Sequence, residues 1–335
     1  MWTIFSLSLT LSFLASLVFE KIAPRLGFVD IAEGDALKIH HRPIPYLGGV
    51  AMFIAAALSL LFMAPPDMRS LLLGVLLAAL PVLALGFWDD MKWKHRTQVK
   101  PFLKFAFLIL IPLLAATILW IAGWRLDFPP FLLFVPAIAF TAFVLMNSVN
   151  YQDGMDGLAG SLTAVSFGGF AVVSLLLGNS LGFVLSIAFF GAVLGFLVLN
   201  LPPAKIFMGD AGSLFIGFML AAFSLTESYT NVNNLAVLTP VIILGVPIFD
   251  TLFVMLMRAK QGKPVYFGSP DHFPLRLKRS GMSGRRVLTI VYSVGFILAI
   301  VAYVSTKLPV FHAGILYTLV FAFAIFAGVK LSRMK

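Results

Sequence analysis

Long apolar runs alternate with short polar gaps along the whole chain. A helix needs about 20 apolar residues to cross the hydrocarbon core of a bilayer. The runs that approach this length are residues 2–19, 47–64, 70–87, 102–122, 130–147, 159–178, 181–200, 211–226, 235–257, 288–305 and 311–329. The pattern therefore predicts an all-α, polytopic integral membrane protein with about eleven spans, or ten if one of the shorter runs stops before the far side.

The composition agrees with a bilayer protein. Of the 335 residues, 60% are hydrophobic and 11% are charged, and the mean hydropathy is +1.01. Soluble domains keep about a quarter of their residues charged. The net charge of +10 does not indicate a nucleic-acid partner, because the basic residues flank apolar segments and form no separate patch. The absence of cysteine excludes disulfides, thiolate nucleophiles and cysteine-bound zinc.

The basic residues predict which loops face the cytoplasm. The first apolar run is followed, not preceded, by Lys21, which is typical of a true first helix with its N-terminus outside. Alternation then places residues 20–46, 88–101, 148–158, 201–210, 258–287 and the tail from Lys330 inside. With Lys104 at the edge of the second loop, these segments hold 21 of the 24 lysines and arginines, as the positive-inside rule requires. We expect one transmembrane domain, residues 1–335, with a cytoplasmic C-terminus and an active site formed by the five inner loops.

Two adjacent carboxylates, Asp89 and Asp90, end the third apolar run. Neighbouring residues point about 100° apart on a helix, which disfavours joint ligation of one ion. We expect one carboxylate to meet a metal or the substrate and the other to orient a lysine. A solvated helix end is the alternative.

A second polar segment carries amide and carboxylate groups at a spacing of three residues: Asn150, Asp153 and Asp156. If the turn is helical, the three side chains share a face. Gly154 and Gly157 let the backbone approach a ligand closely. Because this loop has no lysine or arginine, an external cation is needed to balance its charge. A plain polar turn is the alternative.

A glycine-rich segment, Gly209-Asp210-Ala-Gly-Ser213, opens a later helix. Asp210 is suited to an N-cap, and the free N–H groups of such a helix start attract an anion. Asp250 lies at the inner end of its span, where an ion pair with Arg258 and a role in substrate binding are both open.

Basic side chains accompany the acidic groups on the same side. They are Lys38, His40, His41 and Arg42, then Lys100, then His272 and Arg276. Contact with anionic lipid headgroups is the alternative for each of them. Oxygen ligands without thiolates suit Mg²⁺ or Mn²⁺ better than zinc, and Mg²⁺ uses one or two carboxylates together with substrate phosphates. An acidic metal site, basic phosphate-binding residues and a bilayer location together predict phosphoryl transfer to or from a lipid.

In these segments the chain resembles the polyprenyl-phosphate N-acetylhexosamine-1-phosphate transferases, bacterial enzymes of glycosyltransferase family 4. The likeness runs from about residue 20 to 287 and is carried by five ordered motifs. They are Lys38-Ile-His40 with Ile44-Pro45 and Gly48-Gly49, Asp89-Asp90 with Lys100, Asn147–Leu158, Asn200–Ser213, and Pro247-Ile-Phe-Asp250 with the loop that ends at Gly281. A lone pair of aspartates is a weak signal, whereas five motifs in order on one side of a membrane are a specific one.

The resemblance implies a UDP-sugar donor, above all UDP-N-acetylglucosamine, an undecaprenyl or other polyprenyl phosphate acceptor, and Mg²⁺, with Mn²⁺ as an alternative. It implies the initiating step of cell-envelope glycan synthesis, with release of UMP, at the cytoplasmic face of the bacterial inner membrane. By position, Asp210 and Asn150 contact the metal, Asp156 faces the uracil, Lys100 binds phosphate and Asp89 deprotonates the lipid phosphate. The catalytic candidates are Asp89, Asp90 and Asp153, and the substrate-binding candidates are Lys38, His40, Lys100, Asp156, Gly209, His272 and Arg276.

The last inner loop departs from the family's pattern. Relatives carry a cluster of histidines there, whereas residues 269–276 keep only His272. The peptidoglycan-precursor enzymes are rich in histidine at this place. A phospho-N-acetylmuramoyl-pentapeptide transferase is therefore the less favoured alternative, and a member resembling the O-antigen or teichoic-acid initiating branch fits better.

Other classes of protein fit less well. An ion-coupled transporter places charges near the bilayer midplane, with repeats and broken helices, whereas the acidic groups here end helices on one side. Prenyltransferases and CDP-alcohol phosphotransferases expect aspartates four apart, or an arginine that the run 153–160 lacks. A covalent phosphosugar intermediate on an aspartate and a homodimer both stay open.

Overall fold

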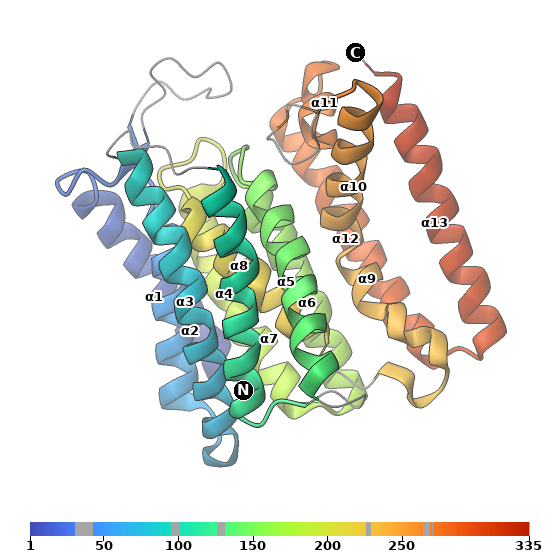
Figure 1. The fold of residues 1–335 in the computed structure, drawn as a ribbon, viewed down its shortest axis with the longest axis horizontal. Helices are drawn as coiled ribbons and strands as arrows, with labels where there is room; N and C mark the ends of the chain where they lie inside the picture. The colour runs from blue at the N-terminus through green and yellow to red at the C-terminus, as the bar shows by residue number, and fades with distance from the viewer. Residues whose placement is uncertain are drawn as a thin grey trace. The chain divides into compact units, whose positions relative to one another are not determined.

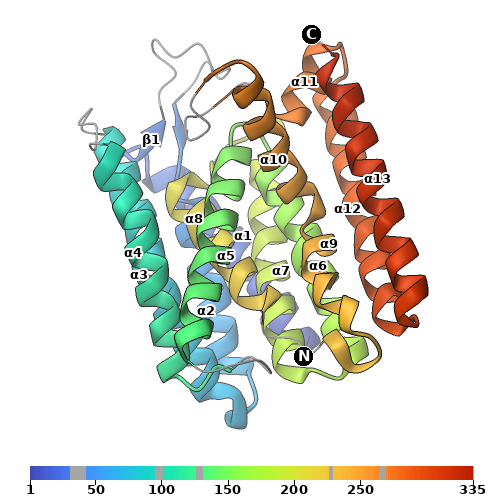
Figure 2. The same cartoon turned by 45° about the vertical axis from the view of Figure 1, so that its right-hand side comes forward.

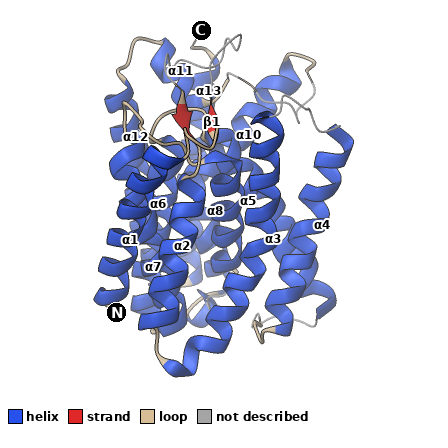
Figure 3. Cartoon of the chain, turned by 90° about the vertical axis from the view of Figure 1, so that its left-hand side faces the viewer, coloured by secondary structure: helices blue, strands red, loops and turns tan. Residues whose placement is uncertain are grey.

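The computed structural model describes residues 1–30, 43–94, 101–125, 131–225, 229–263, 269 and 271–334. Within this part of the chain the regular structure is helical apart from one short antiparallel pair of strands, β1 (Val29–Asp30) and β2 (Ile44–Pro45), as Figure 3 shows. The α-helices are α1 (Trp2–Ile22), α2 (Gly48–Met63), α3 (Arg69–Lys94), α4 (Pro101–Ile121), α5 (Phe131–Gln152), α6 (Leu158–Leu177), α7 (Ser180–Asn200), α8 (Gly209–Ser224), α9 (Thr239–Ile243), α10 (Gly245–Lys260), α11 (Phe273–Arg279), α12 (Gly284–Lys307) and α13 (Val310–Ser332). The 3₁₀ turns are η1 (Pro66–Met68), η2 (Tyr229–Asn231) and η3 (Asn234–Leu238). The prediction of an all-α, polytopic membrane protein is confirmed.

Each predicted span coincides with a helix or with a bent pair of helices. Eight of the described helices are long and apolar enough to cross a membrane, and the bent pair Asn234–Ile243 and Gly245–Lys260 makes a ninth. The two remaining runs form α2 and α8, which are apolar but only 16 residues long. The pattern of apolar runs thus located the helices, whereas which of the shorter ones cross the bilayer stays a prediction.

The run 235–257 differs from its prediction as one continuous helix. It is broken at Leu244, and its two parts meet at 75°. Pro247 lies in the first turn of α10, where the proline's missing N–H is tolerated, whereas inside a continuous helix it would remove a hydrogen bond. Proline chemistry therefore favours a new helix start at this point.

The chain divides into two compact units, Met1–Glu227 with α1–α8 and Ser228–Lys335 with η2–α13 (Figure 1). In the first unit, α7 packs against α1 and α6, and α8 packs against α3 and α5. In the second unit, α12 packs against α9 and α13. The side chain of Asn233 ties the second unit together at one end, because its Nδ2 donates to the carbonyls of Ser305 and Leu308 at 2.9 and 2.8 Å.

Small residues allow α1 and α7 to approach closely. Ser8 and Ser12 donate their hydroxyls to the carbonyls of Ala188 and Ala192 at 2.7 and 2.6 Å. A Cβ added at Gly191 would lie 2.6 Å from the carbonyl oxygen of Phe5. Interhelical hydrogen bonds and small residues drive association where lipid removes the hydrophobic contribution, so this interface is built as membrane helices require.

A second close approach joins α2 and α3 to the start of α8. A Cβ at Gly49 would overlap the backbone of Gly212, and a Cβ at Gly86 would overlap the backbone of Asp210 and Ala211. The carbonyls of Phe207 and Met208 accept the N–H groups of Gly48 and Gly49 at 3.0 and 2.9 Å. The glycines therefore bring the C-terminal end of α3, with its two aspartates, directly against the N-terminus of α8.

Candidate active site

Three helix ends meet at one end of the first unit: the C-terminal ends of α3 and α5 and the N-terminus of α8. Figure 2 shows this end, with β1 beside it. Nδ2 of Asn150, near the end of α5, donates to Oδ1 of Asp210 at 2.7 Å and to Oγ of Ser213 at 2.9 Å. The structure thus places the two residues predicted to hold a metal in direct contact, although they are 60 positions apart in the chain.

The buried carboxylate of Asp90 caps α8. Its Oδ1 accepts the backbone N–H of Asp210 at 2.9 Å and its Oδ2 accepts that of Ala211 at 3.0 Å. The sequence predicts that Asp210 itself is the N-cap, and this prediction is wrong: the N-cap position is Met208, and Asp210 lies in the first turn. The helix start does attract an anion, as predicted, but the anion is a carboxylate from α3.

Gly209 makes this helix start sterically feasible. Its φ of +72° is in the left-handed region, and a Cβ there would lie 2.6 Å from the carbonyl oxygen of Tyr46 and 2.8 Å from Oδ2 of Asp90. The hydroxyl of Tyr46 donates to the carbonyl of Asp90 at 3.3 Å. Burial, with the charges of Asp90 and Asp30, raises the pKa of Tyr46 to about 12, so its phenol keeps its proton.

Asp89 points to a different partner from its neighbour. Its side chain pairs with Nζ of Lys104, in the first turn of α4, and the same ammonium lies 3.6 Å from Oδ2 of Asp210. One half of the expected division of labour is therefore seen, since Asp89 engages a lysine; Asp90 binds the backbone of α8, and contact of either aspartate with a metal or the substrate stays a prediction. From the sequence, Lys104 has no role beyond its place at a loop edge, so the structure adds it as a functional candidate.

The segment after α5 brings two more carboxylates to the same end of the unit. Burial raises the pKa of Asp153 well above its usual range, and the charges of Asp210 and Asp156 raise it further, while a hydrogen bond from the backbone of Gly209 acts in the opposite direction. Asp156 accepts the backbone N–H of Ala204 at 3.0 Å. The shared helical face predicted from spacing does not form, because α5 ends at Gln152 and residues 153–157 form turns and a bend. Asn150 and Asp153 still contact the start of α8, and Asp156 contacts the loop before it.

The loop between α7 and α8 is held in place by Asn200. Its Oδ1 accepts the N–H of Gly157 at 3.1 Å and its Nδ2 donates to the carbonyl of Ile206 at 2.9 Å. Asn200 is buried, so these bonds lie inside the protein. This residue connects two of the five motifs and orients the backbone on both sides of the acidic group.

In the second unit, Asp250 and His272 form a buried pair, with 2.7 Å between Oδ2 and Nδ1. The sequence leaves open an ion pair of Asp250 with Arg258 and a role in substrate binding; the side-chain contact that the structure shows for Asp250 is with His272. Arg276 is held by its own unit: it donates to Oδ1 of Asp271 at 2.7 Å and to the carbonyl of Met334 at 2.9 Å. The substrate-binding roles of His272 and Arg276 stay predictions.

Several predicted residues lie outside the described part of the chain. They are Lys38, His40, His41, Arg42 and Lys100. Their roles therefore rest on the sequence alone.

The donor set at the first unit's polar end suits a hard cation. Asp210 is partly exposed and offers carboxylate oxygen, and the side chain of Asn150 offers amide oxygen once its amide is turned, since Nδ2 now faces Asp210. Among the described residues, no three His, Cys, Asp or Glu side chains cluster as metal ligands. Mg²⁺ binds through one or two carboxylates and completes its shell with water and substrate phosphates, so this small set of oxygen ligands fits Mg²⁺.

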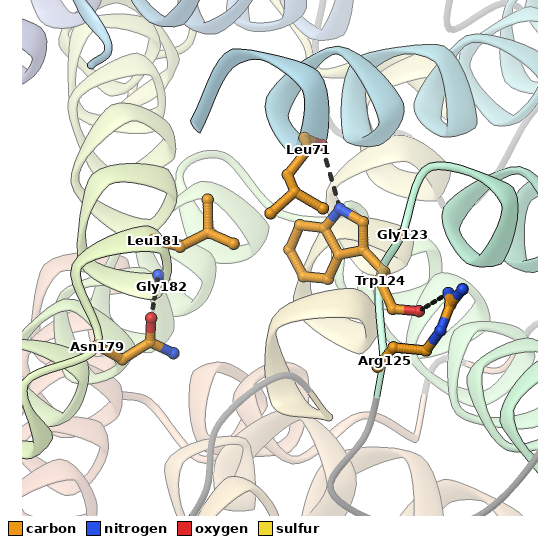
Figure 4. A pocket seen from close by; sticks show the side chains of 7 residues that line it. All are labelled: Leu71, Gly123, Trp124, Arg125, Asn179, Leu181 and Gly182. Carbon is orange, nitrogen blue, oxygen red and sulfur yellow. Dashed lines mark hydrogen bonds between the residues drawn. The ribbon is translucent and has the colours of Figure 1, made fainter. Parts of the chain in front are cut away.

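A cavity of about 200 Å³ lies at the opposite end of α3, near the end of α4 and the start of α7 (Figure 4). Its lining includes Leu71 at the start of α3, Trp124 and Arg125 after α4, and Asn179 before α7. Its polar groups are already engaged: Trp124 Nε1 donates to the carbonyl of Leu71, Arg125 to that of Trp124, and Asn179 accepts from Gly182. The cavity is therefore not part of the charged site.

A lysine set among carboxylates at one end of an apolar bundle is a polar site suited to a charged ligand. A sequence model described as glycosyl transferase family 4 matches residues 72–228. The chain is 33% identical over 310 residues to a probable undecaprenyl-phosphate N-acetylglucosaminyl 1-phosphate transferase of Bacillus subtilis, an alignment covering 90% of this chain and 83% of that protein. The chain belongs to this family of membrane phosphotransferases.

Two further relatives show the range of the family. A phospho-N-acetylmuramoyl-pentapeptide-transferase of Clostridium beijerinckii is 31% identical over 324 residues, covering 89% of this chain and 95% of that protein. A decaprenyl-phosphate N-acetylglucosaminephosphotransferase of Mycobacterium tuberculosis is 32% identical over 315 residues, covering 81% of this chain and 74% of that protein. The resemblance stated from the motifs is confirmed, and the names differ in the sugar and in the lipid.

Proposed function

We propose that this protein transfers N-acetylglucosamine 1-phosphate from UDP-N-acetylglucosamine to undecaprenyl phosphate, at the cytoplasmic face of a bacterial inner membrane. The observation that carries the proposal is the convergence of Asp89, Lys104, Asn150 and Asp210 from four helices on one polar end of the bundle. The name of the Bacillus subtilis relative supports the sugar and the lipid. The step starts a lipid-linked cell-envelope glycan.

In this reaction, an oxygen of the lipid phosphate attacks the β-phosphorus of the UDP-sugar. The bond from the β-phosphorus to the bridging oxygen breaks, UMP leaves with the α-phosphate, and a lipid-linked diphosphate sugar remains. Such transfers need little covalent help from the protein, so positioning and charge neutralisation dominate. The residues of the site have to bring two anions together in line.

Lys104 is the described cation best placed for this task. Its ammonium lies beside Asp89 and 3.6 Å from Asp210, so it neutralises the two carboxylates in the substrate-free site. A phosphate oxygen that replaces one of these carboxylates keeps the lysine paired. Asp89, released from the lysine, accepts a proton from the lipid phosphate where that phosphate still carries one. A phosphate monoester is mostly dianionic near neutral pH, so this proton transfer contributes modestly.

Asp210 and Asn150 would hold Mg²⁺, which neutralises pyrophosphate charge when bound. Asp90 keeps the first turn of α8, and with it Asp210, in place through its two backbone hydrogen bonds. Asp156 lies against the loop that connects α7 and α8 and would meet the uracil. The polar end is thus divided between a nucleotide side and a lipid-phosphate side.

The test is purified full-length protein in detergent with Mg²⁺, undecaprenyl phosphate and a panel of UDP-sugars, scored by release of UMP. We expect release with UDP-N-acetylglucosamine and its loss when EDTA removes the metal. Release only with UDP-N-acetylmuramoyl-pentapeptide would instead assign the function of the Clostridium beijerinckii relative. Folded protein that releases no UMP from any donor would reject the proposal.

A further inference from the structure

Asp210 presents two carboxylate oxygens at the N-terminus of α8, and each of them faces a donor. Oδ1 accepts a hydrogen bond from Nδ2 of Asn150 at 2.7 Å, and Oδ2 lies 3.6 Å from the ammonium of Lys104. The side chain of Asp210 is 25% exposed, so a ligand can reach it. The carboxylate that is predicted to hold a divalent ion therefore already has a positive charge beside it.

The two aspartates of α3 are committed to other partners. Both oxygens of Asp90 accept backbone N–H groups of α8, and Asp89 is hydrogen-bonded to Lys104. Asp89 and Asp90 are also buried. Of these three aspartates, Asp210 is therefore the one that combines exposure with oxygens that a divalent ion can take.

Lys104 makes two contacts of different strength. It donates a hydrogen bond to Asp89, whereas its distance of 3.6 Å to Oδ2 of Asp210 is that of an ion pair without a hydrogen bond. A divalent ion that binds Asp210 replaces the weaker contact, while the stronger one keeps the ammonium nearby. The two positive charges then repel each other. At contact distance this repulsion weakens binding by at least about 10-fold, even at the dielectric constant of water.

Phosphate groups remove this conflict between two cations. A phosphate that meets both the ion and the lysine is attracted by each of them, and the lysine gains a charge-assisted hydrogen bond. The side chain of Lys104 is 40% exposed, so a phosphate oxygen can reach it. The ion and the phosphates should therefore bind more tightly together than either does alone.

We propose that Lys104 couples metal binding to nucleotide binding: it competes with the divalent ion for Asp210, so the ion binds tightly only together with the phosphates of the sugar nucleotide. The inference rests on the proposed function for the identity of those phosphates. It also gives Lys104 a role after the reaction. When UMP leaves, the ammonium returns to Asp210 and lowers the affinity of the site for the remaining ion.

Binding of Mn²⁺ without nucleotide gives the first test. Full-length protein in a neutral detergent is titrated with Mn²⁺, and the electron paramagnetic resonance signal of the unbound ion gives the dissociation constant. The site is assigned by its loss in Asp210→Asn. We expect Lys104→Met to bind Mn²⁺ at least about 10-fold more tightly than wild type, because the repelling charge is gone. Lys104→Gln, which can still donate to Asp89, should change the affinity in the same direction.

Two controls separate the charge of the lysine from other effects of the substitution. Lys104→Arg keeps the positive charge, so its affinity for Mn²⁺ should stay near that of wild type. Lys307→Met removes an exposed lysine at the C-terminal end of α12 and should also leave the affinity unchanged.

UDP gives the second test, because it carries a diphosphate but no sugar to transfer. Saturating UDP should tighten the binding of Mn²⁺ to wild type, and Mn²⁺ should tighten the binding of UDP by the same factor. Direct contact between the ion and the phosphates supplies part of this factor, and that part persists in Lys104→Met. The part that depends on Lys104 is lost there, so the factor should be at least about 10-fold smaller than in wild type.

The outcomes distinguish this inference from the proposed function. Folded Lys104→Met and Lys104→Gln that bind Mn²⁺ no more tightly than wild type would overturn the inference and leave the proposed function standing. If neither variant folds, the wild type still decides, because an affinity for Mn²⁺ that UDP leaves unchanged contradicts the coupling. A wild type that releases no UMP from any donor would reject the proposed function, whereas tighter Mn²⁺ binding by the two neutral variants would still establish the competition.

Discussion

Asp90 accepts the backbone N–H of Asp210 at 2.9 Å, so the second aspartate of the pair on α3 fixes the helix start that carries the predicted metal ligand. Its other oxygen accepts from Ala211 at 3.0 Å. Asp90 thus acts through the backbone, whereas Asp89 acts through Lys104. Two adjacent carboxylates serve different partners because a helix turns their side chains in different directions.

Asp90→Asn should therefore lower both stability and turnover. The amide replaces one acceptor oxygen by a donor that faces a backbone N–H, so we expect a loss of about 1–2 kcal/mol in the free energy of unfolding, as for a lost helix cap. Turnover should fall because Asp210 moves with its helix start. Thermal unfolding in detergent and UMP release measure the two effects, with Asp67→Asn as the exposed control. Unchanged unfolding with abolished turnover would make Asp90 a chemical group rather than a cap.

Lys104→Met should reduce turnover by about 10²-fold, the usual loss when one preorganised charged or hydrogen-bonding group is removed from a transition state. The change leaves Asp89 and Asp210 facing one another without their shared cation. Lys104→Arg should retain part of the rate, because it keeps the charge but alters its shape. The matched control is Lys307→Met, at the exposed C-terminal end of α12, which should behave as wild type. Full activity of Lys104→Met would remove this lysine from the proposed mechanism.

The positions of the helices follow from the sequence, because burial in lipid selects apolar runs of a set length and every predicted run is a helix or a bent pair. The contact between Asn150 and Asp210 could also be anticipated, because counting the spans places both residues on the same side of the membrane. The break at Leu244 could not be predicted, because Pro247 is compatible either with a kink or with a new helix start.

The sequence does not predict which charged side chains pair with one another. Lys104 sits in an apolar run and looks like one more lipid-facing cation, and only the packing of α3, α4 and α8 directs it at two carboxylates. Asp250 has Arg258 two turns away on its own helix, yet its partner is His272, which the chain brings back after a reversal. Such pairs depend on tertiary contacts that no local spacing encodes.

Gly49→Ala should destabilise the protein by about 1–3 kcal/mol, the usual result of overpacking a tight contact. A Cβ at Gly49 would overlap the backbone of Gly212, which cannot move aside as a flexible side chain does. The control is Gly284→Ala at the start of α12, where an added Cβ meets nothing within 4 Å. There the better helix propensity of alanine should leave stability equal or slightly higher. Unfolding temperatures in the same detergent check both, and equal stability of Gly49→Ala would contradict the close approach of α2 and α8.

Asp271 should give the second unit a stability that acid removes. Partial burial acts to raise the pKa of Asp271, but hydrogen bonds from Arg276, Ser269 and Gln261, with the charge of Arg276, lower it below its usual range. A carboxyl group whose pKa is lower in the folded protein stabilises the fold above its unfolded pKa, about 3.9, and loses that contribution as pH falls through the folded value. Asp271→Asn should therefore unfold at a lower temperature than wild type at neutral pH, with a loss of about 1 kcal/mol in the free energy of unfolding, since the amide keeps part of the hydrogen bonding but loses the charge. The gap between the two proteins should close as the pH falls below about 4. Thermal unfolding measured from neutral to acidic pH, with Asp67→Asn alongside, decides this; a gap that stays constant over the whole range would show that Asp271 stabilises the segment by shape and not by charge.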